Sequence, residues 1–493
     1  MDAESERYGI PTALLMENAG RAVADAVCRS APRSVCVVAG GGNNGGDALV
    51  AARMLYARGC KVGVVLSKPL SDLRGLAALN ARRCADDGVT LEASAESISA
   101  YDIIIDGLLG TGIAGAPRGR TAELIQVINA SGRPVISIDV PSGIDSDATT
   151  APELAVRATT TVTIGCYKPA LVHFPAAENA GQVLLADIGF PPLSFLAADS
   201  SVLSGGYVRE RVPQWPKDAH KGRRGALLVV AGSRGMTGAP AMSCNAAVNA
   251  GAGLVYLACP DPLVPVMERK LTEAMARPVP SSGRPRFSPE SIDPVLDLLK
   301  AAKAVVLGPG LSQGEGVPEF VAGFLARVGK PTLIDADALN ILASLGLTPP
   351  PNSVLTPHPG EMARLLGTTV AEVQDDRVSA VRSAARAFNA TVVLKGAHTL
   401  VCGPDGHVVV NTVSSNVLAT GGSGDVLSGV IGALLSQGLS PMDAALVGVR
   451  WHGTMGVLAA SRLGGTVGAA TMLKLLPRAR EEMLTTHEAE VLV

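Results

Sequence analysis

The chain has 493 residues, of which 47% are hydrophobic, 3% aromatic and 17% charged, and its formal net charge is −2. This length exceeds one ordinary hydrophobic core, so two or three domains are expected, and the high apolar content argues against disorder. The chain lacks a long basic run, an apolar run of about 20 residues and a C-x-x-C pair, which argues against nucleic-acid binding, membrane insertion and structural zinc.

Short apolar strands alternate with helical patterns in the first part of the chain. A helix is expected at 47–58, ended by Gly59. Continuous apolar strands separated by helices are typical of parallel βαβ units. We expect such strands at 34–40, 61–66, 102–106, 134–139, 159–165 and 183–189.

The alternation stops between residues 190 and about 221. This stretch holds four prolines and no convincing helix, so we interpret it as the connection between two α/β domains, 1–210 and 211–493. The last helices are expected to start near Asp425 and Pro441. Strands of the second domain are expected at 225–231, 254–259, 304–307, 332–335, 353–356, 391–395 and 407–411.

Three glycine-containing loops follow strands of the first domain, at 40–47, 106–112 and 139–145. Ligands of open parallel sheets bind beyond the carboxyl ends of the strands, so these loops are expected to converge on one site. The first loop also begins a helix, where free N–H groups attract anions. The alternative for this loop is an ordinary turn in which Asp47 caps the helix.

The segments LMENAG (15–20), NNGGD (43–47), DGLLGTG (106–112) and DVPSGID (139–145) resemble the epimerase domain of the bifunctional NAD(P)H-hydrate repair enzymes. The resemblance implies a Rossmann-like three-layer sandwich, with Asp139 as general acid and base. It implies a K⁺ ion held by Asn44, Asp106 and Ser142. The implied substrate-binding residues are Asn43, Asn44, Gly45, Gly46, Asp47, Gly110, Thr111, Gly112, Ile113, Ala114, Gly115, Ala116 and Asp139.

The first domain departs from the family pattern at two places. Ala48 stands where the family has glycine after NNGGD, and residues 149–161 are less regular than the family pattern. Lys168 and Pro169 follow the next strand as they do in the family. These departures concern the loops of the expected epimerase rather than its strands.

The second domain has its own polar and glycine loops at strand ends, and the loop 420–425 precedes an apolar helix. Such a loop at a helix N-terminus forms an anion site, and Asp425 would reach a bound hydroxyl. The alternative is an ordinary helix cap. No G-x-x-x-x-G-K-[ST] segment occurs, so a P-loop is not expected.

The order GSRGMTGA, GAGLV, LGPGL, DADAL, TPHPGE, KGAHT and GGSGD resembles the ribokinase-like dehydratase domain of the same repair enzymes, which in bacteria use ADP on the S epimer. The resemblance implies that Ala252, Gly253, Gly310, His358 and Asp425 contact the hydrate. Glu361 corresponds to a residue near Mg²⁺ in related kinases. The residues implied to hold AMP are Lys395, Gly396, Ala397, His398, Thr399 and Gly424.

The implied chemistry is the repair of NADHX and NADPHX, the hydrates of NADH and NADPH. Hydroxide is a poor leaving group, so phosphoryl transfer from ADP to the C6 hydroxyl would create a better one. Asp425 would act as the base, and AMP and phosphate would be the products. Two alternatives remain open: a small-molecule kinase with a regulatory N-terminal domain, and a non-enzymatic N-terminal scaffold. We expect a cytoplasmic homo-oligomer with small-molecule partners; ADP rather than ATP rests on the resemblance alone.

Overall fold

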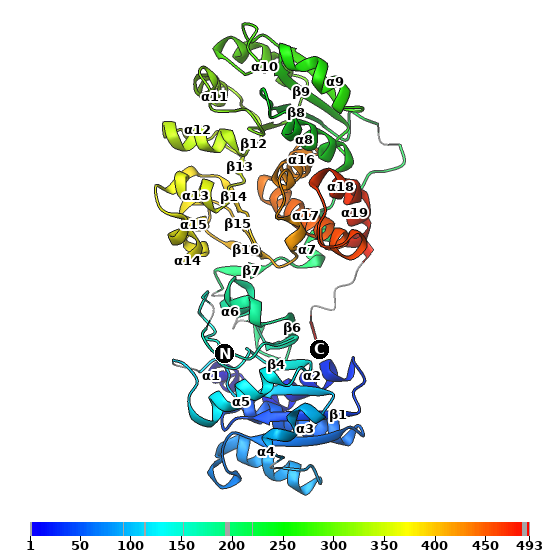
Figure 1. The fold of residues 1–493 in the computed structure, drawn as a ribbon, viewed down its shortest axis with the longest axis vertical. Helices are drawn as coiled ribbons and strands as arrows, with labels where there is room; N and C mark the ends of the chain where they lie inside the picture. Colours follow the sequence, from blue (N-terminus) through cyan, green and yellow to red (C-terminus); the bar gives the residue numbers. More distant parts are fainter. Residues whose placement is uncertain are drawn as a thin grey trace. The chain divides into compact units, whose positions relative to one another are not determined.

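The computed structural model describes residues 2–91, 93–112, 115–150, 152–192, 198–218, 220–485 and 491–492. The chain forms two compact units, residues 1–198 together with 488–493, and residues 199–487 (Figure 1). No helix in the described part of the chain is long and apolar enough to cross a bilayer.

The first unit contains a seven-stranded parallel sheet in the order β17-β6-β5-β4-β3-β1-β2. Its strands are β1 (Ser34–Ala39), β2 (Lys61–Leu66), β3 (Ile103–Gly107), β4 (Val135–Ile138), β5 (Thr160–Ile164), β6 (Gln182–Ala186) and β17 (Val491–Leu492). Its helices are α1 (Asp2–Arg7), α2 (Thr12–Cys28), α3 (Asn43–Ala57), α4 (Gly75–Asp86), α5 (Gly119–Ala130) and α6 (Pro169–Val172).

Alternating residues of β1 enter two different cores, which makes the first unit three layers thick. Val35 and Val37 pack with apolar residues of α2 and α3, whereas Cys36 and Val38 pack with those of α5. A strand buried on both faces needs the continuous apolar sequence that β1 has. The expected three-layer sandwich is therefore confirmed.

The second unit contains a ten-stranded sheet in the order β10-β9-β8-β11-β12-β13-β14-β15-β16-β7. All neighbouring strands are parallel except β14 with β15 and β15 with β16. The strands are β7 (Ser200–Val202), β8 (Ala226–Val230), β9 (Leu254–Pro260), β10 (Met275–Val279), β11 (Ala304–Leu307), β12 (Thr332–Ile334), β13 (Ser353–Leu355), β14 (Thr391–Leu394), β15 (Thr399–Cys402) and β16 (Val408–Asn411).

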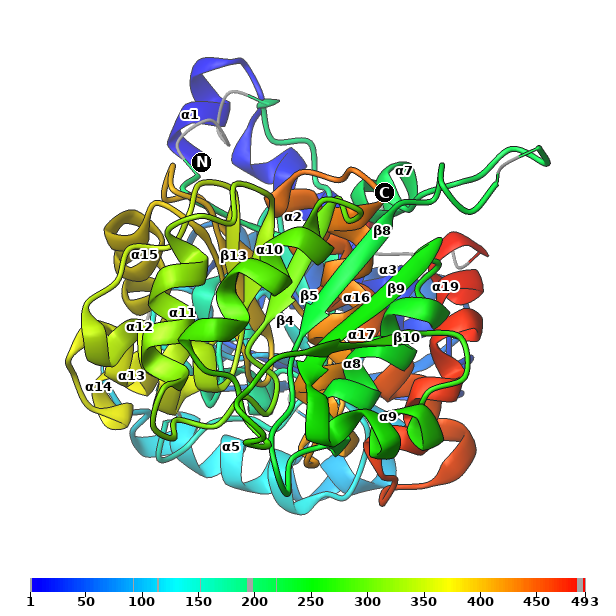
Figure 2. The ribbon, with the colours of Figure 1, turned by 90° about the horizontal axis from the view of Figure 1, so that it is seen from above.

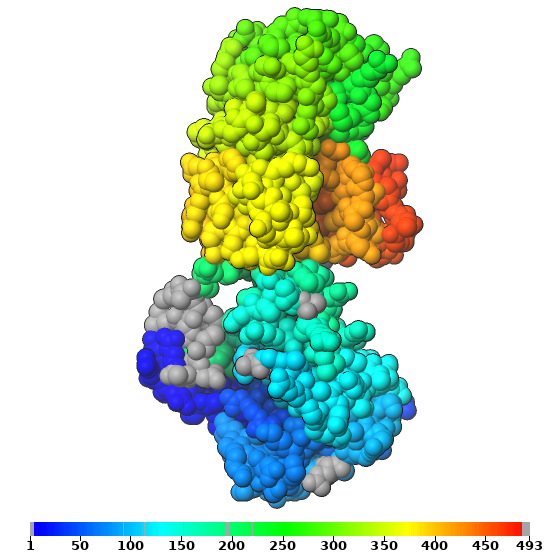
Figure 3. Space-filling view, turned by 60° about the vertical axis from the view of Figure 1, so that its left-hand side comes forward, coloured from blue at the N-terminus to red at the C-terminus, as the bar shows by residue number. Residues whose placement is uncertain are grey.

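Helices cover both faces of this second sheet (Figure 2). On one face α10 to α15 form a continuous layer, and the outer surface of α13 to α15 is the yellow area of Figure 3. On the other face α8, α16 and α17 pack on the strands and form the main core of the unit. The helices are α7 (Gly205–Arg211), α8 (Gly238–Asn249), α9 (Val264–Lys270), α10 (Ile292–Leu299), α11 (Val317–Leu325), α12 (Asp337–Leu345), α13 (Pro359–Leu366), α14 (Val370–Asp375), α15 (Arg377–Phe388), α16 (Ser423–Ser436), α17 (Pro441–Leu463), α18 (Ala469–Met472) and α19 (Leu476–Thr485).

The structure differs from the sequence analysis between residues 190 and 221. The second unit begins at Asp199, because β7 pairs with β16, and not after residue 210. The helix α7 was not expected there, since it begins with two glycines. Contacts with α17 stabilise it: Tyr207 Oη donates to Asp443 over 2.8 Å, and Arg211 forms an ion pair with Asp443 at 2.9 Å.

Candidate functional site

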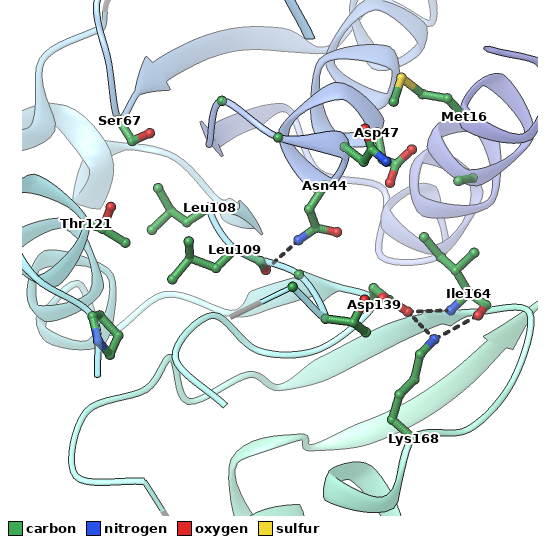
Figure 4. Close-up of a pocket in the computed structure, with 18 of the residues that line it drawn as sticks. Met16, Asn44, Asp47, Ser67, Leu108, Leu109, Thr121, Asp139, Ile164 and Lys168 are labelled. Carbon is green, nitrogen blue, oxygen red and sulfur yellow. Dashed lines mark hydrogen bonds and ion pairs between the residues drawn. The ribbon is translucent and has the colours of Figure 1, made fainter. Parts of the chain in front are cut away.

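A cavity of about 1100 Å³ lies at the carboxyl ends of the strands of the first unit (Figure 4). Its walls come from the loops after β1 to β6 and from the start of α2. Ile113 and Ala114 fall outside the described residues. The other expected substrate residues that line the cavity are Asn43, Asn44, Asp47, Gly110, Thr111, Gly112, Gly115, Ala116 and Asp139.

Two further glycines of the NNGGD segment serve packing instead of lining the cavity. A Cβ on Gly45 would lie 1.9 Å from the carbonyl oxygen of Gly40, and one on Gly46 would lie 2.6 Å from Met16. Gly45 lets α3 start directly beside the end of β1, and Gly46 lets α3 pack closely on α2. The helix begins at Asn43, earlier than the expected residue 47, and its N-cap is Gly42, so the alternative in which Asp47 caps the helix is wrong.

The three residues expected to hold K⁺ lie together beneath the cavity loops. Ser142 donates to Asp106 through its hydroxyl at 2.5 Å and through its backbone N–H at 2.9 Å. The Asn44 amide donates to the carbonyls of Leu109 at 2.7 Å and Ile138 at 3.1 Å. Leu109 joins the group, because its N–H donates to the Ser142 hydroxyl at 2.9 Å.

Asp106 is a fully buried carboxylate, and among the residues described no cationic side chain forms an ion pair with it. Burial raises the pKa of its carboxyl group, against hydrogen bonds from Ser142 and Ser137 that lower it. A buried negative charge beside hydroxyl and carbonyl oxygens suits a hard monovalent cation. The residues present therefore fit K⁺.

Asp139 lies at the end of β4 with its backbone in the left-handed region, at φ +66°. Its Oδ1 accepts a hydrogen bond from the Ile164 N–H at 3.1 Å and forms an ion pair with Lys168 Nζ. Asp139 and Lys168 both line the cavity (Figure 4). In the sequence, Lys168 stands out only as part of the family pattern, and its position after the strand β5 is the signal that could have identified it.

The second unit gathers charged groups at the carboxyl ends of β12, β13 and β14. Lys395 Nζ lies 2.9 Å from Asp335 Oδ1 and 3.7 Å from Glu361 Oε2. Burial alone would raise the pKa of Asp335, but Lys395 and hydrogen bonds from Ser428 and Thr356 outweigh burial and lower that pKa. Ser428 lies on α16, so this cluster ties the sheet to the helix that carries Asp425.

Asp425 occupies the first turn of α16, next to this cluster. Burial raises the pKa of its carboxyl group to about 7, and the charges of Asp335 and Asp337 act in the same direction. Gly424 also borders Lys395, because a Cβ on Gly424 would lie 3.5 Å from Nζ. A carboxyl group poised near neutral pH at a helix N-terminus can act as a base beside an anion.

His358 and Glu361 cap α13 reciprocally. The His358 ring accepts hydrogen bonds from the N–H groups of Gly360 and Glu361, and Glu361 Oε2 accepts one from the His358 N–H at 2.8 Å. No group of three His, Cys, Asp or Glu side chains suited to a metal occurs among the residues described. A single carboxylate still fits Mg²⁺ that is held mainly by phosphates and water.

The expected nucleotide loop, Lys395 to Thr399, connects β14 to β15. Gly396 has φ +148°, a conformation that strains any residue with a Cβ, and it lies next to the Arg377 guanidinium, 2.5 Å from the position that a Cβ would take. His398 also has positive φ, at +50°. Thr399 closes the turn through its hydroxyl, which donates to the Gly396 carbonyl at 3.1 Å.

Two of the expected hydrate-binding residues, Ala252 and Gly253, do not join this cluster. They precede β9, and a Cβ on Gly253 would lie 1.9 Å from the Lys221 carbonyl oxygen. The start of a parallel strand lies at the opposite edge of the sheet from the loops that follow strands. Gly310 does follow a strand, β11, and it packs against Met236 in the loop after β8 and against Ala239 at the start of α8.

A sequence profile described as NAD(P)H-hydrate dehydratase matches residues 227–478, and one described as YjeF-related protein N-terminus matches residues 12–170. A ribokinase-like superfamily protein from Enterococcus faecalis has the fold of the second unit, with 24% identity, a TM-score of 0.52, and coverage of 58% of this chain and 98% of that chain. The ADP/ATP-dependent NAD(P)H-hydrate dehydratase from Bacillus subtilis, co-crystallised with ATP/Mg²⁺, is 30% identical with a TM-score of 0.51. The match covers 57% of this chain and 98% of that chain.

These folds and sites define a two-domain α/β protein with a Rossmann-like first unit and a ribokinase-like second unit. The bifunctional NAD(P)H-hydrate repair enzyme from Moorella thermoacetica is 38% identical over 96% of this chain and 93% of its own length. The bifunctional NAD(P)H-hydrate repair enzyme from Escherichia coli is 36% identical over 91% of this chain and 86% of its own length. The chain belongs to the family of bifunctional NAD(P)H-hydrate repair enzymes, and the small-molecule kinase alternative is not favoured.

Proposed function

We propose that this chain repairs hydrated NAD(P)H in two steps. The first unit interconverts the R and S epimers of NAD(P)HX, and the second unit dehydrates the S epimer at the expense of ADP, giving AMP and phosphate. The observation that carries the proposal is the Asp425 carboxyl group, whose pKa is raised by burial to about 7 at the start of α16, beside Lys395. Family membership supports the same pair of reactions.

In the first unit, Asp139 is the acid and base. It takes the proton of the C6 hydroxyl while the C6–N1 bond breaks and its electron pair moves to N1, which leaves an aldehyde at C6. The proton returns when N1 closes on the opposite face of that aldehyde, so no reagent is consumed. Asn44, Asp106 and Ser142 would hold K⁺, and the ion would supply positive charge that stabilises developing negative charge.

In the second unit, Asp425 takes the proton of the C6 hydroxyl as its oxygen attacks the β-phosphorus of ADP. The bond from that phosphorus to the bridging oxygen breaks, and AMP leaves with the electron pair. The new C6 phosphate then departs with the C6–O electron pair and accepts a proton from C5, whose C–H electron pair forms the C5–C6 double bond. Lys395 and the N–H groups of α16 stabilise the phosphoryl charge.

The remaining residues of the second site hold the two substrates. Lys395, Gly396, Ala397, His398, Thr399 and Gly424 surround the AMP part, while Gly310 and His358 contact the hydrate. Glu361 would provide a carboxylate for Mg²⁺, and the ion would neutralise phosphate charge. Whether ATP replaces ADP is decided by assay with each nucleotide.

The test is an assay of the full chain with each epimer and each nucleotide, following the return of NADH absorbance. Asp425→Asn is expected to lower dehydration of the S epimer at least about 100-fold and to leave R-to-S conversion unchanged, because the base is lost in one unit only. The matched control is Asp297→Asn, an exposed aspartate of α10 that pairs with Lys300. Loss of both activities in a folded Asp425→Asn protein, or retained dehydration, would contradict the proposal.

A further inference from the structure

Lys168 has no role in the reaction as written above, yet it has a defined place in the cavity of the first unit. Its ammonium group contacts three oxygens: Asp139 Oδ1, the Ile164 carbonyl at 2.8 Å and the Thr163 hydroxyl at 3.1 Å. Only 12% of the Lys168 side chain and 14% of the Asp139 side chain are exposed. Lys168 is thus held between the end of β5 and the end of β4 (Figure 4).

The contacts of Asp139 are unevenly divided between its two carboxylate oxygens. Lys168 and the Ile164 N–H both donate to Oδ1, and no hydrogen bond to Oδ2 occurs among the residues described. The Asp139 N–H also donates to the Val162 carbonyl at 2.7 Å, which fixes the left-handed backbone. Because Asp139 lines the cavity, Oδ2 is the oxygen left to meet a ligand.

We infer that Lys168 is the positioning residue of the epimerase site. It holds Oδ1 so that Oδ2 faces C6 of the hydrate, and it compensates the carboxylate charge that would otherwise stand alone in a mostly buried site. Without Lys168, Oδ1 keeps only the Ile164 bond, and the carboxylate can rotate about χ1 and χ2 away from the substrate. This inference rests on the proposed epimerase function of the first unit.

If Lys168 acts only through Asp139, its replacement should have no further effect on the rate once Asp139 is also replaced, which a double-mutant cycle can measure. Asp139→Asn is expected to lower R-to-S conversion about 100-fold or more. Lys168→Met is expected to lower kcat about tenfold or more with a KM within about twofold, because a misplaced group costs rate rather than binding. The double variant is expected to be no slower than Asp139→Asn alone. Lys168→Arg is expected to retain most of kcat.

The full chain contains its own folding control, since dehydration of the S epimer by the second unit should be unchanged in every variant. The matched charge control is Lys68→Met. Lys68 also lines the cavity but forms no ion pair in the described part of the chain, so its effect should simply multiply with that of Asp139→Asn. If Lys168→Met melts early, Lys168→Gln keeps a hydrogen-bond donor without the charge and takes its place.

Each outcome of this experiment has one meaning. If Asp139→Asn is inactive but Lys168→Met keeps its kcat, or if the two effects multiply, Lys168 does not position Asp139 and the inference is overturned. If Asp139→Asn itself keeps R-to-S conversion, the assignment of the base in the proposed function fails, and the inference fails with it.

Discussion

At the residue scale, Asp425 makes the stability of the second unit depend on pH. Its pKa is raised by burial to about 7, whereas an unfolded chain releases the proton near about pH 4. Between about pH 4 and about pH 7 the folded unit therefore binds more protons than the unfolded chain. For this reason Asp425 makes the free energy of unfolding of the second unit fall as pH rises through this range. The penalty is complete above about pH 7, where the folded carboxylate is ionised.

Asp425→Asn removes this penalty, so the variant should gain stability over the wild type as pH rises. The gain in melting temperature of the second unit should be several degrees at about pH 8, corresponding to about 4 kcal/mol in the free energy of unfolding, and smaller at about pH 5. Calorimetry across this range checks it, with Asp297→Asn, a change at an exposed aspartate, as the control. A gain that does not change with pH would show that Asp425 is not buried as an ionisable group.

At the element scale, glycines on α16 set how closely this helix approaches its neighbours. A Cβ on Gly429 would lie 2.2 Å from the Ser243 carbonyl oxygen of α8, and one on Gly432 would lie 2.3 Å from Val306 of β11. Backbone atoms cannot give way as a flexible side chain can. The close packing of α16 therefore places its N-terminus, with Asp425, at the strand ends.

Gly429→Ala should push α16 away from α8. We expect a loss of about 1–3 kcal/mol in the free energy of unfolding of the second unit, together with slower dehydration. Gly206→Ala in α7 is the matched control, because its Cβ would meet nothing closer than 3.8 Å. Denaturant unfolding of both variants measures the difference, and equal stabilities would mean that α16 tolerates a wider separation.

At the scale of the whole molecule, each unit has its own sheet, its own core and its own set of strand-end loops. The candidate residues of the first site all belong to the first unit, and those of the second site all belong to the second. Ligands of one reaction should therefore stabilise one unit at a time.

Saturating ADP with Mg²⁺ should slow hydrogen exchange in the second unit only. At about 100 times its Kd, ADP would stabilise that unit by about 2.7 kcal/mol. Protection is expected at residues 395–399 and at the start of α16, and none is expected from β1 to β6. Mass-spectrometric exchange of the full chain checks this, and protection of the loops around Asp139 would show that ADP binds the first unit.

Most strands and the glycine loops could be predicted from the sequence, because the apolar runs and turn residues that encode them are local. The loops 40–47, 106–112 and 139–145 follow β1, β3 and β4 as expected. The strands β7, β10, β15 and β17 were missed. These strands are short and their sequences carry no clear strand signal, so they join a sheet only because they pair with strands that are distant in the sequence.

By itself, the sequence determined two α/β units with charged and glycine-rich loops at their strand ends. Only the tertiary structure decided which of these groups meet. It joined Lys168 to Asp139 and Lys395 to Asp335, and it separated Gly253 from the second cluster. The reason is that strand patterns depend on neighbouring residues, whereas a contact between side chains depends on strand order and register, which are set by residues far apart in the chain.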